Sequence, residues 1–312
     1  MPSRINPDAL RAQLSPLHHT AELTADARYY QAYYGLDLPH HGGIQRRLGR
    51  FQVHGYEVVA QAWYPEQPVA TLLVLHGYYD HMGLYRHVVD WGLRMGFAVL
   101  ACDLPGHGLS SGPRASINEF EEYQAVLQGL LHEAAAMELP HPWHLLGQST
   151  GAAIVLDYLL CQPVHPALGQ SILLAPLVRP RAWGWSRFSY EVMRRFVKQI
   201  PRRFSENSGD PAFLQFIQSS DPLQPDILPT AWVGALSRWI QRIEGAPASP
   251  HSPLIVQGEA DMTVDWQHNL PVLQDKFAAP EILRLPSARH HLVNEQEALR
   301  REYFGFLSER LK

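Results

Sequence analysis

Short apolar runs alternate with helical patterns along most of this sequence. Residues 71–75, 97–102 and 171–176 form continuous apolar runs that end in turn-forming residues. Such runs are typical of strands buried on both faces of a parallel sheet. Apolar residues at helical spacing lie between them, near 85–95, 117–137 and 152–160. This order, with its short connections, predicts an α/β fold with a mostly parallel central sheet flanked by helices.

The alternation stops after Pro176 and resumes near residue 250. Residues 177–249 are rich in Trp, Arg and Pro instead, with helical patterns near 185–200, 211–219 and 230–243. We therefore expect one α/β core, residues 50–176 and 250–312, interrupted by a helical cap or lid at 177–249. The core should open with a hairpin turning at His54-Gly55. Residues 1–49 are predicted to form an N-terminal segment with one short helix.

Composition excludes several classes of protein. The chain has 312 residues, a net charge of −4 and 46% hydrophobic residues, which suits a large globular core and neither disorder nor nucleic-acid binding. Cys102 and Cys161 are predicted to be free thiols in a reducing compartment. The first 19 residues lack the apolar stretch of a signal peptide, and no run reaches the roughly 18 apolar residues of a membrane span. These features favour a cytoplasmic protein.

A serine lies between two glycines where a strand pattern meets a helix pattern. The pentapeptide Gly147-Gln148-Ser149-Thr150-Gly151 fits G-x-S-x-G, with WHLLG before it and AAIVLDYLL after it. At such a bend the serine hydroxyl is lifted above the carboxyl end of the sheet, and the glycines leave room for the strained backbone. Ser149 is therefore the predicted nucleophile.

A serine nucleophile needs a base, and the base needs an orienting acid. For this kind of bend the expected chain order is Ser, then Asp or Glu, then His. Asp261 follows the strand pattern PLIVQG and is the favoured acid, ahead of Asp265 and Glu259. The base should come from SARHH after the strand pattern EILRLP, where His290 and His291 both qualify by position.

The developing oxyanion of acyl transfer needs main-chain donors. One is expected at the N–H of Thr150, directly after the serine. The other is expected in the loop after the strand 71–75, at the N–H of Tyr78. The histidine pairs of the sequence have no partners at zinc-like spacing, so no metal site is predicted. Acyl transfer by a serine, a histidine and an acid requires neither a metal nor an organic cofactor, and none is predicted.

Four segments together resemble the serine α/β-hydrolases of the monoacylglycerol lipase and lysophospholipase group. They are HGYYDHMGLYRHVVDWGLRMGFAVLACDLPGHGLSSGPR, GQSTGAAIVLDYL, LIVQGEADMTVD and SARHHLVNE, and the likeness spans about residues 50–310. The resemblance implies the α/β-hydrolase fold and an oxyanion hole at Tyr78 and Thr150. It also implies Asp261 as the acid and His290, rather than His291, as the base. GQSTG in place of the more usual GHSMG, and SARH in place of GARH or GAYH, remove no reacting group.

The predicted function is hydrolysis of lipid acyl esters, of a monoacylglycerol or a lysophospholipid, through an acyl-enzyme. The same triad would serve an amidase, a peptidase or a thioesterase, and a non-catalytic ligand-binding protein on this fold is a further alternative. The segment 179–204 interleaves eight Arg and Lys residues with six aromatic ones. That pattern is typical of peripheral contact with an anionic membrane, and it also fits a solvated basic face packed on the core. The sequence leaves the oligomeric state open.

Overall fold

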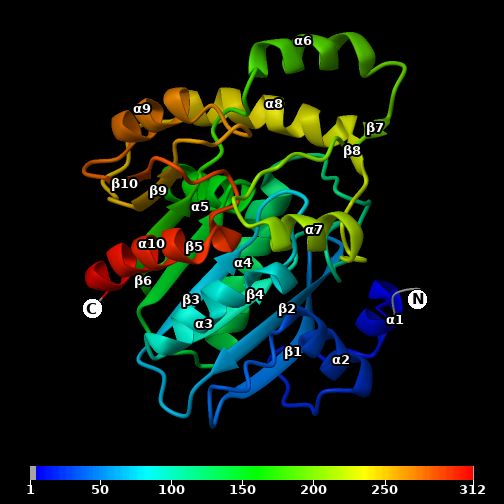
Figure 1. The fold of residues 1–312 in the computed structure, drawn as a ribbon, viewed down its shortest axis with the longest axis vertical. Helices are drawn as coiled ribbons and strands as arrows, with labels where there is room; N and C mark the ends of the chain where they lie inside the picture. Colours follow the sequence, from blue (N-terminus) through cyan, green and yellow to red (C-terminus); the bar gives the residue numbers. More distant parts are fainter. Residues whose placement is uncertain (1–4, 312) are drawn as a thin grey trace.

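An eight-stranded sheet forms the centre of the protein in the computed structural model, which describes residues 5–311 (Figure 1). The strand order is β1-β2-β4-β3-β5-β6-β9-β10. The strands are β1 (Gln45–Val53), β2 (Tyr56–Tyr64), β3 (Ala70–Leu75), β4 (Phe97–Cys102), β5 (Trp143–Gln148), β6 (Leu168–Leu174), β9 (Leu254–Gly258) and β10 (Glu281–Leu285). The pairs β1–β2 and β2–β4 are antiparallel and the others are parallel. The predicted mostly parallel sheet is confirmed.

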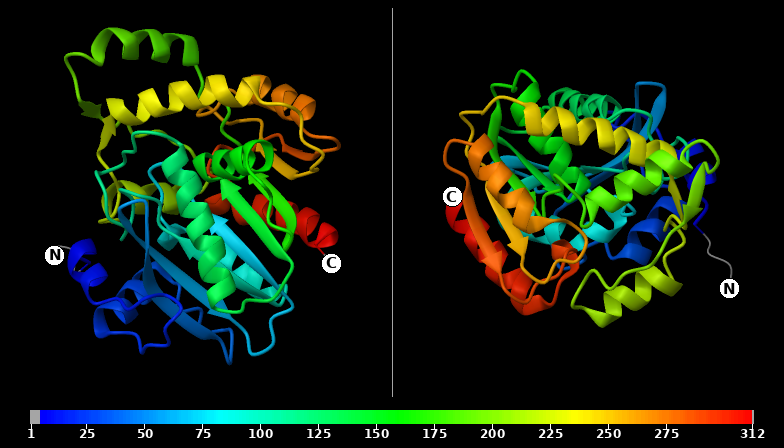
Figure 2. Two further views of the ribbon diagram at one scale, coloured as in Figure 1. Left: turned by 180° about the vertical axis from the view of Figure 1, so that it is seen from behind. Right: turned by 90° about the horizontal axis from the view of Figure 1, so that it is seen from above.

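Helices cover both faces of this sheet (Figures 1 and 2). One face packs against α3 (Arg86–Arg94) and α10 (Glu297–Arg310), and the other against α4 (Glu121–Ala136), α5 (Thr150–Cys161) and α9 (Trp266–Lys276). Alternate residues of β3 enter the two cores: Leu72 and Val74 one, Leu73 and Leu75 the other. This explains the continuous apolar runs, because every side chain of such a strand is buried.

The hairpin begins the sheet, but earlier than the sequence indicates. β1 starts at Gln45, five residues before the expected start of the core, and it pairs with β2 across the predicted His54-Gly55 turn. Two helices precede it, α1 (Pro7–Ala12) and α2 (Ala25–Tyr34), where one short helix was expected. The first four residues of the predicted N-terminal segment lie outside the described part of the chain.

Residues 177–249, here called the cap segment, lie over the carboxyl end of the sheet. They contain α6 (Trp183–Met193), α7 (Pro211–Ser219) and α8 (Thr230–Gly245), together with a two-stranded ribbon of β7 (Gln199–Pro201) and β8 (Ile227–Pro229). The first helix ends about seven residues before its predicted end near 200, because the chain turns there into β7. In Figures 1 and 2, α6 lies outermost, above α8.

The start of α4 differs from the sequence-based expectation. The helical pattern of the sequence begins near residue 117, whereas the helix begins at Glu121. The carboxylate of Glu122 accepts hydrogen bonds from the N–H groups of Asn118 and Glu119, at 2.8 and 3.0 Å. A first-turn glutamate thus ties the helix to the loop that precedes it. Among residues 5–311, no helix is long and apolar enough to cross a membrane.

Candidate active site

Ser149 occupies a strained bend between β5 and α5. Its φ of 54° and ψ of −110° lie in a region that non-glycine residues rarely adopt, and its N–H donates to the carbonyl of Leu174 at 2.8 Å. The two glycines that flank Ser149 in the motif, Gly147 and Gly151, have no room for a side chain, because backbone atoms lie against them. A Cβ on Gly147 would lie 2.3 Å from the backbone of Gly151, and one on Gly151 would lie 2.1 Å from the carbonyl oxygen of Leu75. The close packing of α5 on the sheet therefore explains both glycines of the motif.

Gly151→Ala is expected to lower the free energy of unfolding by about 3 kcal/mol, because the new methyl group meets backbone that cannot move aside cheaply. Gly305→Ala is the matched control. It lies on the exposed side of α10 with no atom within 4 Å of the added carbon, and it should stabilise the protein by about 1 kcal/mol. Urea unfolding measures both changes. Equal stability of the two variants would contradict this account of the motif.

The structure brings Ser149, His290 and Asp261 into one hydrogen-bonded chain. Nε2 of His290 lies 2.9 Å from Oγ of Ser149, and its Nδ1 lies 2.7 Å from Oδ2 of Asp261. All three side chains follow the carboxyl ends of strands: β5, β10 and β9 respectively. Parallel strands bring these ends to one edge of the sheet, which is how residues so distant in sequence meet. Ser149 keeps 8% of its surface accessible, and the other two are more buried.

Asp261 is fixed on both oxygens. Oδ1 accepts hydrogen bonds from the N–H groups of Thr263 and Val264, at 2.7 and 3.1 Å, and Oδ2 accepts one from the amide of Gln257 at 3.2 Å. The two rival acids have other partners. Asp265 caps the start of α9, and Glu259 pairs with Arg284 on the adjacent strand.

Electrostatic coupling shifts the pKa values of this pair in opposite directions. Burial alone would raise the pKa of Asp261, but the positive charge and hydrogen bond of His290, with the two main-chain N–H groups, lower it overall. Burial alone would lower the pKa of His290, but the Asp261 carboxylate raises it above the ordinary 6.5. The pair therefore favours a carboxylate that stabilises a protonated imidazole.

His291 points away from Ser149 and holds the neighbouring loop. Its Nε2 lies 3.0 Å from Oδ1 of Asp80, whose Oδ2 accepts a hydrogen bond from Tyr85 at 3.0 Å. The same Tyr85 hydroxyl accepts the N–H of Gly77 at 3.0 Å. The two adjacent histidines thus have separate tasks: His290 reaches the serine, and His291 joins its own loop to the loop at 77–80. Their positions in the sequence left both open, and only the family resemblance favoured His290.

The main-chain N–H groups of Tyr78 and Thr150 have no hydrogen-bond acceptor among the described residues. Both residues line one cavity of about 310 Å³ together with Ser149 and His290. Gly77 packs against the serine, since a Cβ there would lie 3.4 Å from the Cβ of Ser149. Trp232 of α8 stacks on the ring of Tyr78 at 3.7 Å, so the cap segment forms the roof of the cavity.

Gln148 contributes to the site in a way that the sequence analysis missed. Its side-chain amide donates to the main-chain carbonyl of His290 at 2.8 Å. The residue before Ser149 therefore ties the bend to the loop that carries the imidazole of His290. In the sequence, Gln148 stands out only as a departure from the usual histidine of the motif. Its hydrogen-bond partner lies 142 positions away, so no local pattern indicates the contact.

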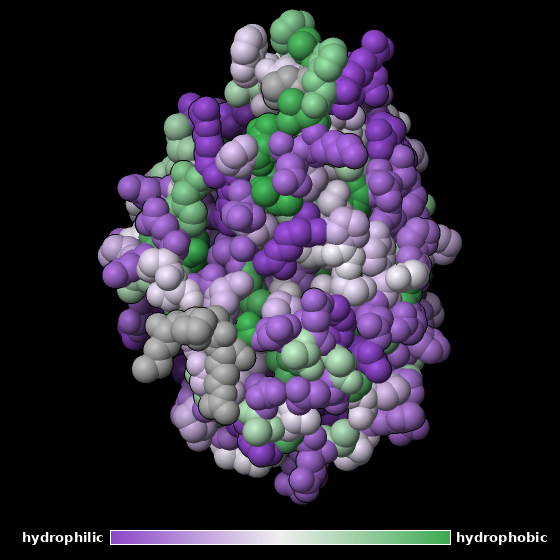
Figure 3. Space-filling view, turned by 90° about the vertical axis from the view of Figure 1, so that its right-hand side faces the viewer, coloured by the Kyte–Doolittle hydropathy of each residue, from purple (hydrophilic) through white to green (hydrophobic). Residues whose placement is uncertain are grey.

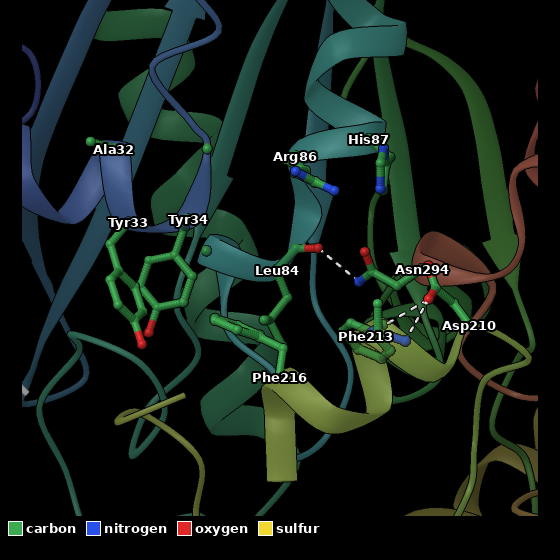
Figure 4. A pocket seen from close by; sticks show the side chains of 13 residues that line it. Ala32, Tyr33, Tyr34, Leu84, Arg86, His87, Asp210, Phe213, Phe216 and Asn294 are labelled. Atoms are coloured by element: carbon green, nitrogen blue, oxygen red, sulfur yellow. Dashed lines mark hydrogen bonds between the residues drawn. The ribbon is translucent and has the colours of Figure 1, made fainter. Parts of the chain in front are cut away.

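A second hollow, of about 370 Å³, lies among α2, α3 and α7 (Figure 4). Tyr33, Tyr34, Phe213 and Phe216 give it aromatic walls, and none of its lining residues belongs to the hydrogen-bonded chain of Ser149. One group of side chains with metal-ligating atoms also comes together in the described residues, namely His40, His41 and Asp90. Both imidazoles bond to the same carboxylate oxygen, and Arg94 pairs with the other.

Comparison with known proteins places this architecture in a family. An uncharacterised abhydrolase domain-containing protein of Dictyostelium discoideum is 34% identical over 121 residues, which are 38% of this chain but only 12% of that protein. A monoacylglycerol lipase of Mycolicibacterium smegmatis is 28% identical over 255 residues, covering 78% of this chain and 90% of the lipase. Among solved structures, a soluble variant of monoglyceride lipase from Saccharomyces cerevisiae, in complex with a substrate analogue, is similar in fold. Its TM-score is 0.72 at 18% identity, covering 85% of this chain and 94% of that one.

The family model described as "Serine aminopeptidase, S33" (Hydrolase_4) matches residues 66–297. The match takes in the bend at Ser149, the cap segment and the loops of Asp261 and His290. The expected α/β-hydrolase fold is confirmed, and since the family model spans well over half of the sequence, the chain belongs to the serine aminopeptidase S33 family of α/β-hydrolases.

Proposed function

We propose that this chain hydrolyses single-chain lipid acyl esters through a Ser149–His290–Asp261 triad. The observation that carries the proposal is the hydrogen-bonded chain from Oγ of Ser149 through the imidazole to Asp261, at 2.9 and 2.7 Å. This geometry is what a serine nucleophile needs for activation. The similarity to monoacylglycerol lipases supports a carboxylic-ester hydrolase of that type.

The mechanism follows from the positions of the side chains. Nε2 of His290 takes the hydroxyl proton of Ser149 as Oγ attacks the ester carbonyl, and Asp261 stabilises the imidazolium that forms. The free N–H groups of Tyr78 and Thr150 are the proposed donors to the oxyanion. Protonated His290 then gives its proton to the leaving alcohol, leaving an acyl-enzyme. Water deprotonated by the same imidazole releases the fatty acid and restores Ser149.

The walls of the cavity favour an acyl chain. Beyond the serine they are formed by apolar side chains from the cap segment and the adjoining loops, namely Leu177, Leu228, Trp232, Leu236 and Val264. Such walls bind methylene groups, each of which contributes about 0.8 kcal/mol when it leaves water. The proposed substrates therefore carry medium or long acyl chains, and acetyl esters should be poor substrates.

Two measurements test the proposal. A fluorophosphonate probe should label the protein at Ser149, and a panel of octanoyl ester, thioester and anilide should show the highest kcat/KM for the ester. The family description names aminopeptidases, so a preference for the anilide would favour an amidase instead. An unlabelled native protein would exclude serine catalysis and leave a ligand-binding role.

We further propose that α6 and the residues after it contact an anionic lipid surface. Trp185, Phe188, Val192 and Phe196 are exposed, with 71, 61, 55 and 85% of their surface accessible. Figure 3 shows hydrophobic side chains gathered at this end of the molecule, among hydrophilic ones. The surrounding cations are Arg187, Arg194, Arg195 and Lys198. Aromatic groups beside basic ones suit the boundary between head groups and acyl chains.

The double variant Phe188→Asp/Phe196→Asp should reduce binding to vesicles containing phosphatidylglycerol by at least about tenfold, because each buried Phe contributes about 1.5–3 kcal/mol. Its kcat/KM toward a dissolved octanoyl ester should stay within about twofold of the native value. Val69→Asp is the control, since Val69 is equally exposed, at 65%, in the loop before β3. Vesicle co-sedimentation measures binding. Equal binding by the native protein and the double variant would contradict the proposal that α6 and the residues after it contact the lipid.

A further inference from the structure

One corner of the active-site cavity is positively charged. Arg202 and Arg203, which directly follow β7, line it together with Ser149 and His290. They are the only Lys or Arg side chains among the residues that line this cavity. Neither makes an ion pair with a carboxylate among the described residues. The neighbouring carboxylates of Asp80, Asp221 and Asp261 each lie against a histidine instead.

The guanidinium of Arg202 is held in place by uncharged groups. It lies 4.1 Å from the ring centre of Tyr79 and 5.3 Å from that of Phe204. Its Nη1 donates to Oε1 of Gln224 at 2.6 Å and to the carbonyl of Pro225 at 3.1 Å. Both recorded side-chain hydrogen bonds of Arg202 come from Nη1, and Nε and Nη2 make none to another described residue. Stacking and two hydrogen bonds therefore orient one edge of the guanidinium and leave the other donors free.

The nearest acids are hydrogen-bonded to other groups and form no ion pair with Arg202. Asp80 lines the same cavity, but its two oxygens bond to His291 and Tyr85. Asp221 bonds to His81 and Tyr34. Burial is the largest influence on Arg202 and lowers its pKa despite these negative neighbours. A half-buried cation without an ion-pair partner is costly in free energy, and a bound anion would offset that cost.

The corner belongs to the same cavity as Ser149. The Tyr79 ring, over which Arg202 lies, is 4.2 Å from the ring of Tyr78, whose main-chain N–H is a proposed oxyanion donor. Apolar side chains of the cap segment, among them Leu228, Trp232 and Leu236, line the same cavity. An ester whose carbonyl lies at Ser149 can therefore place its acyl chain against the apolar walls and its alcohol portion toward Arg202.

We propose that Arg202, assisted by Arg203, binds a phosphate group in the alcohol portion of the substrate, so that the preferred ester is a lysophospholipid with an anionic phosphate and not a neutral monoacylglycerol. This inference rests on the proposed ester hydrolysis and narrows its substrate class. Guanidinium and phosphate match in geometry, because two parallel N–H groups can bond two phosphate oxygens.

A matched pair of substrates tests the inference. 1-Octanoylglycerol and 1-octanoylglycerol 3-phosphate, used below their aggregation concentrations, differ only in the phosphate. The native protein should hydrolyse the phosphate ester with a kcat/KM at least about tenfold higher. Arg202→Gln should lower that kcat/KM by about 10- to 100-fold while changing that of the neutral ester less than about threefold. Arg202→Lys should recover part of the loss, and Arg301→Gln on the far surface of α10 should change neither value.

A binding measurement separates this inference from the proposed function. Glycerol 3-phosphate should bind Ser149→Ala protein in a calorimetric titration, and Arg202→Gln added to that variant should weaken the binding at least about tenfold. Absence of hydrolysis of both esters, with this binding retained, would reject the ester hydrolysis alone. Equal turnover of the two esters, an equal loss of both in Arg202→Gln, or no binding of glycerol 3-phosphate would overturn the role of Arg202.

Discussion

Ser149→Ala is expected to lower kcat for ester hydrolysis by about a million-fold, the loss typical of removing a serine nucleophile. The variant should remain folded, because within residues 5–311 the hydroxyl bonds only to His290, while the strained bend is held by the N–H of Ser149 and the two glycines. Residual turnover would come from binding and from the oxyanion donors, with water attacking directly.

The measurement combines initial rates on an octanoyl ester with fluorophosphonate labelling. Labelling should disappear with Ser149→Ala and persist with Ser219→Ala, an exposed serine of α7 that bonds to the carbonyl of Gln215. Circular dichroism and urea unfolding check that the fold is kept. A Ser149→Ala protein that retained more than about 1% of the native kcat would exclude Ser149 as the nucleophile.

Asp261→Asn is expected to lower kcat by about 10⁴-fold, because the amide cannot hold the imidazole in the tautomer that accepts the serine proton. The substitution keeps shape and burial but removes the negative charge. Asp265→Asn is the matched control. In the described part of the chain the Asp265 side chain bonds to the N–H of His268 and so caps α9, a position where asparagine serves equally well. The kcat should therefore change less than about twofold.

The pH profile gives a second readout of Asp261. Only neutral His290 can accept the serine proton, so kcat/KM falls as the pH drops through its pKa. In the native protein the carboxylate raises the pKa of His290 above 6.5, which places the acid limb of the profile above that pH. Without the carboxylate, burial dominates and lowers the pKa of His290, and the acid limb of Asp261→Asn should move to lower pH. An unchanged limb would mean that another group controls the profile.

Much of the fold could be predicted from local patterns. The hairpin, the buried parallel strands and the helical nature of residues 177–249 follow from periodicity and turn residues, which act over a few positions. Errors arose where distant contacts decide the ends of elements. β1 starts at Gln45 because it pairs with Tyr64, and α4 starts at Glu121 because Glu122 bonds back to the preceding loop.

The candidate site divides in the same way. A strand end followed by a glycine-flanked serine, an acid and a histidine in that order indicated Ser149, Asp261 and the pair His290-His291. Position along the sequence left both histidines open, and only the family resemblance favoured His290. In the structure His290 contacts Ser149 and Asp261, whereas His291 contacts Asp80. Nothing in the sequence distinguishes Arg202 from the other basic residues of the segment 179–204. Only folding shows that it reaches the cavity whereas Arg195, for example, does not line it.

The insertion of the cap segment has a consequence for the entropy of the chain. β6 and β9 are hydrogen-bonded neighbours, although about 80 residues separate Leu174 from its partner Val256. The entropic cost of closing a loop grows only with the logarithm of its length. A connection lengthened from about 20 to about 80 residues therefore costs roughly 1 kcal/mol more. The core gives up little free energy to accommodate this segment, and connections of quite different lengths could join the same two strands at nearly the same cost.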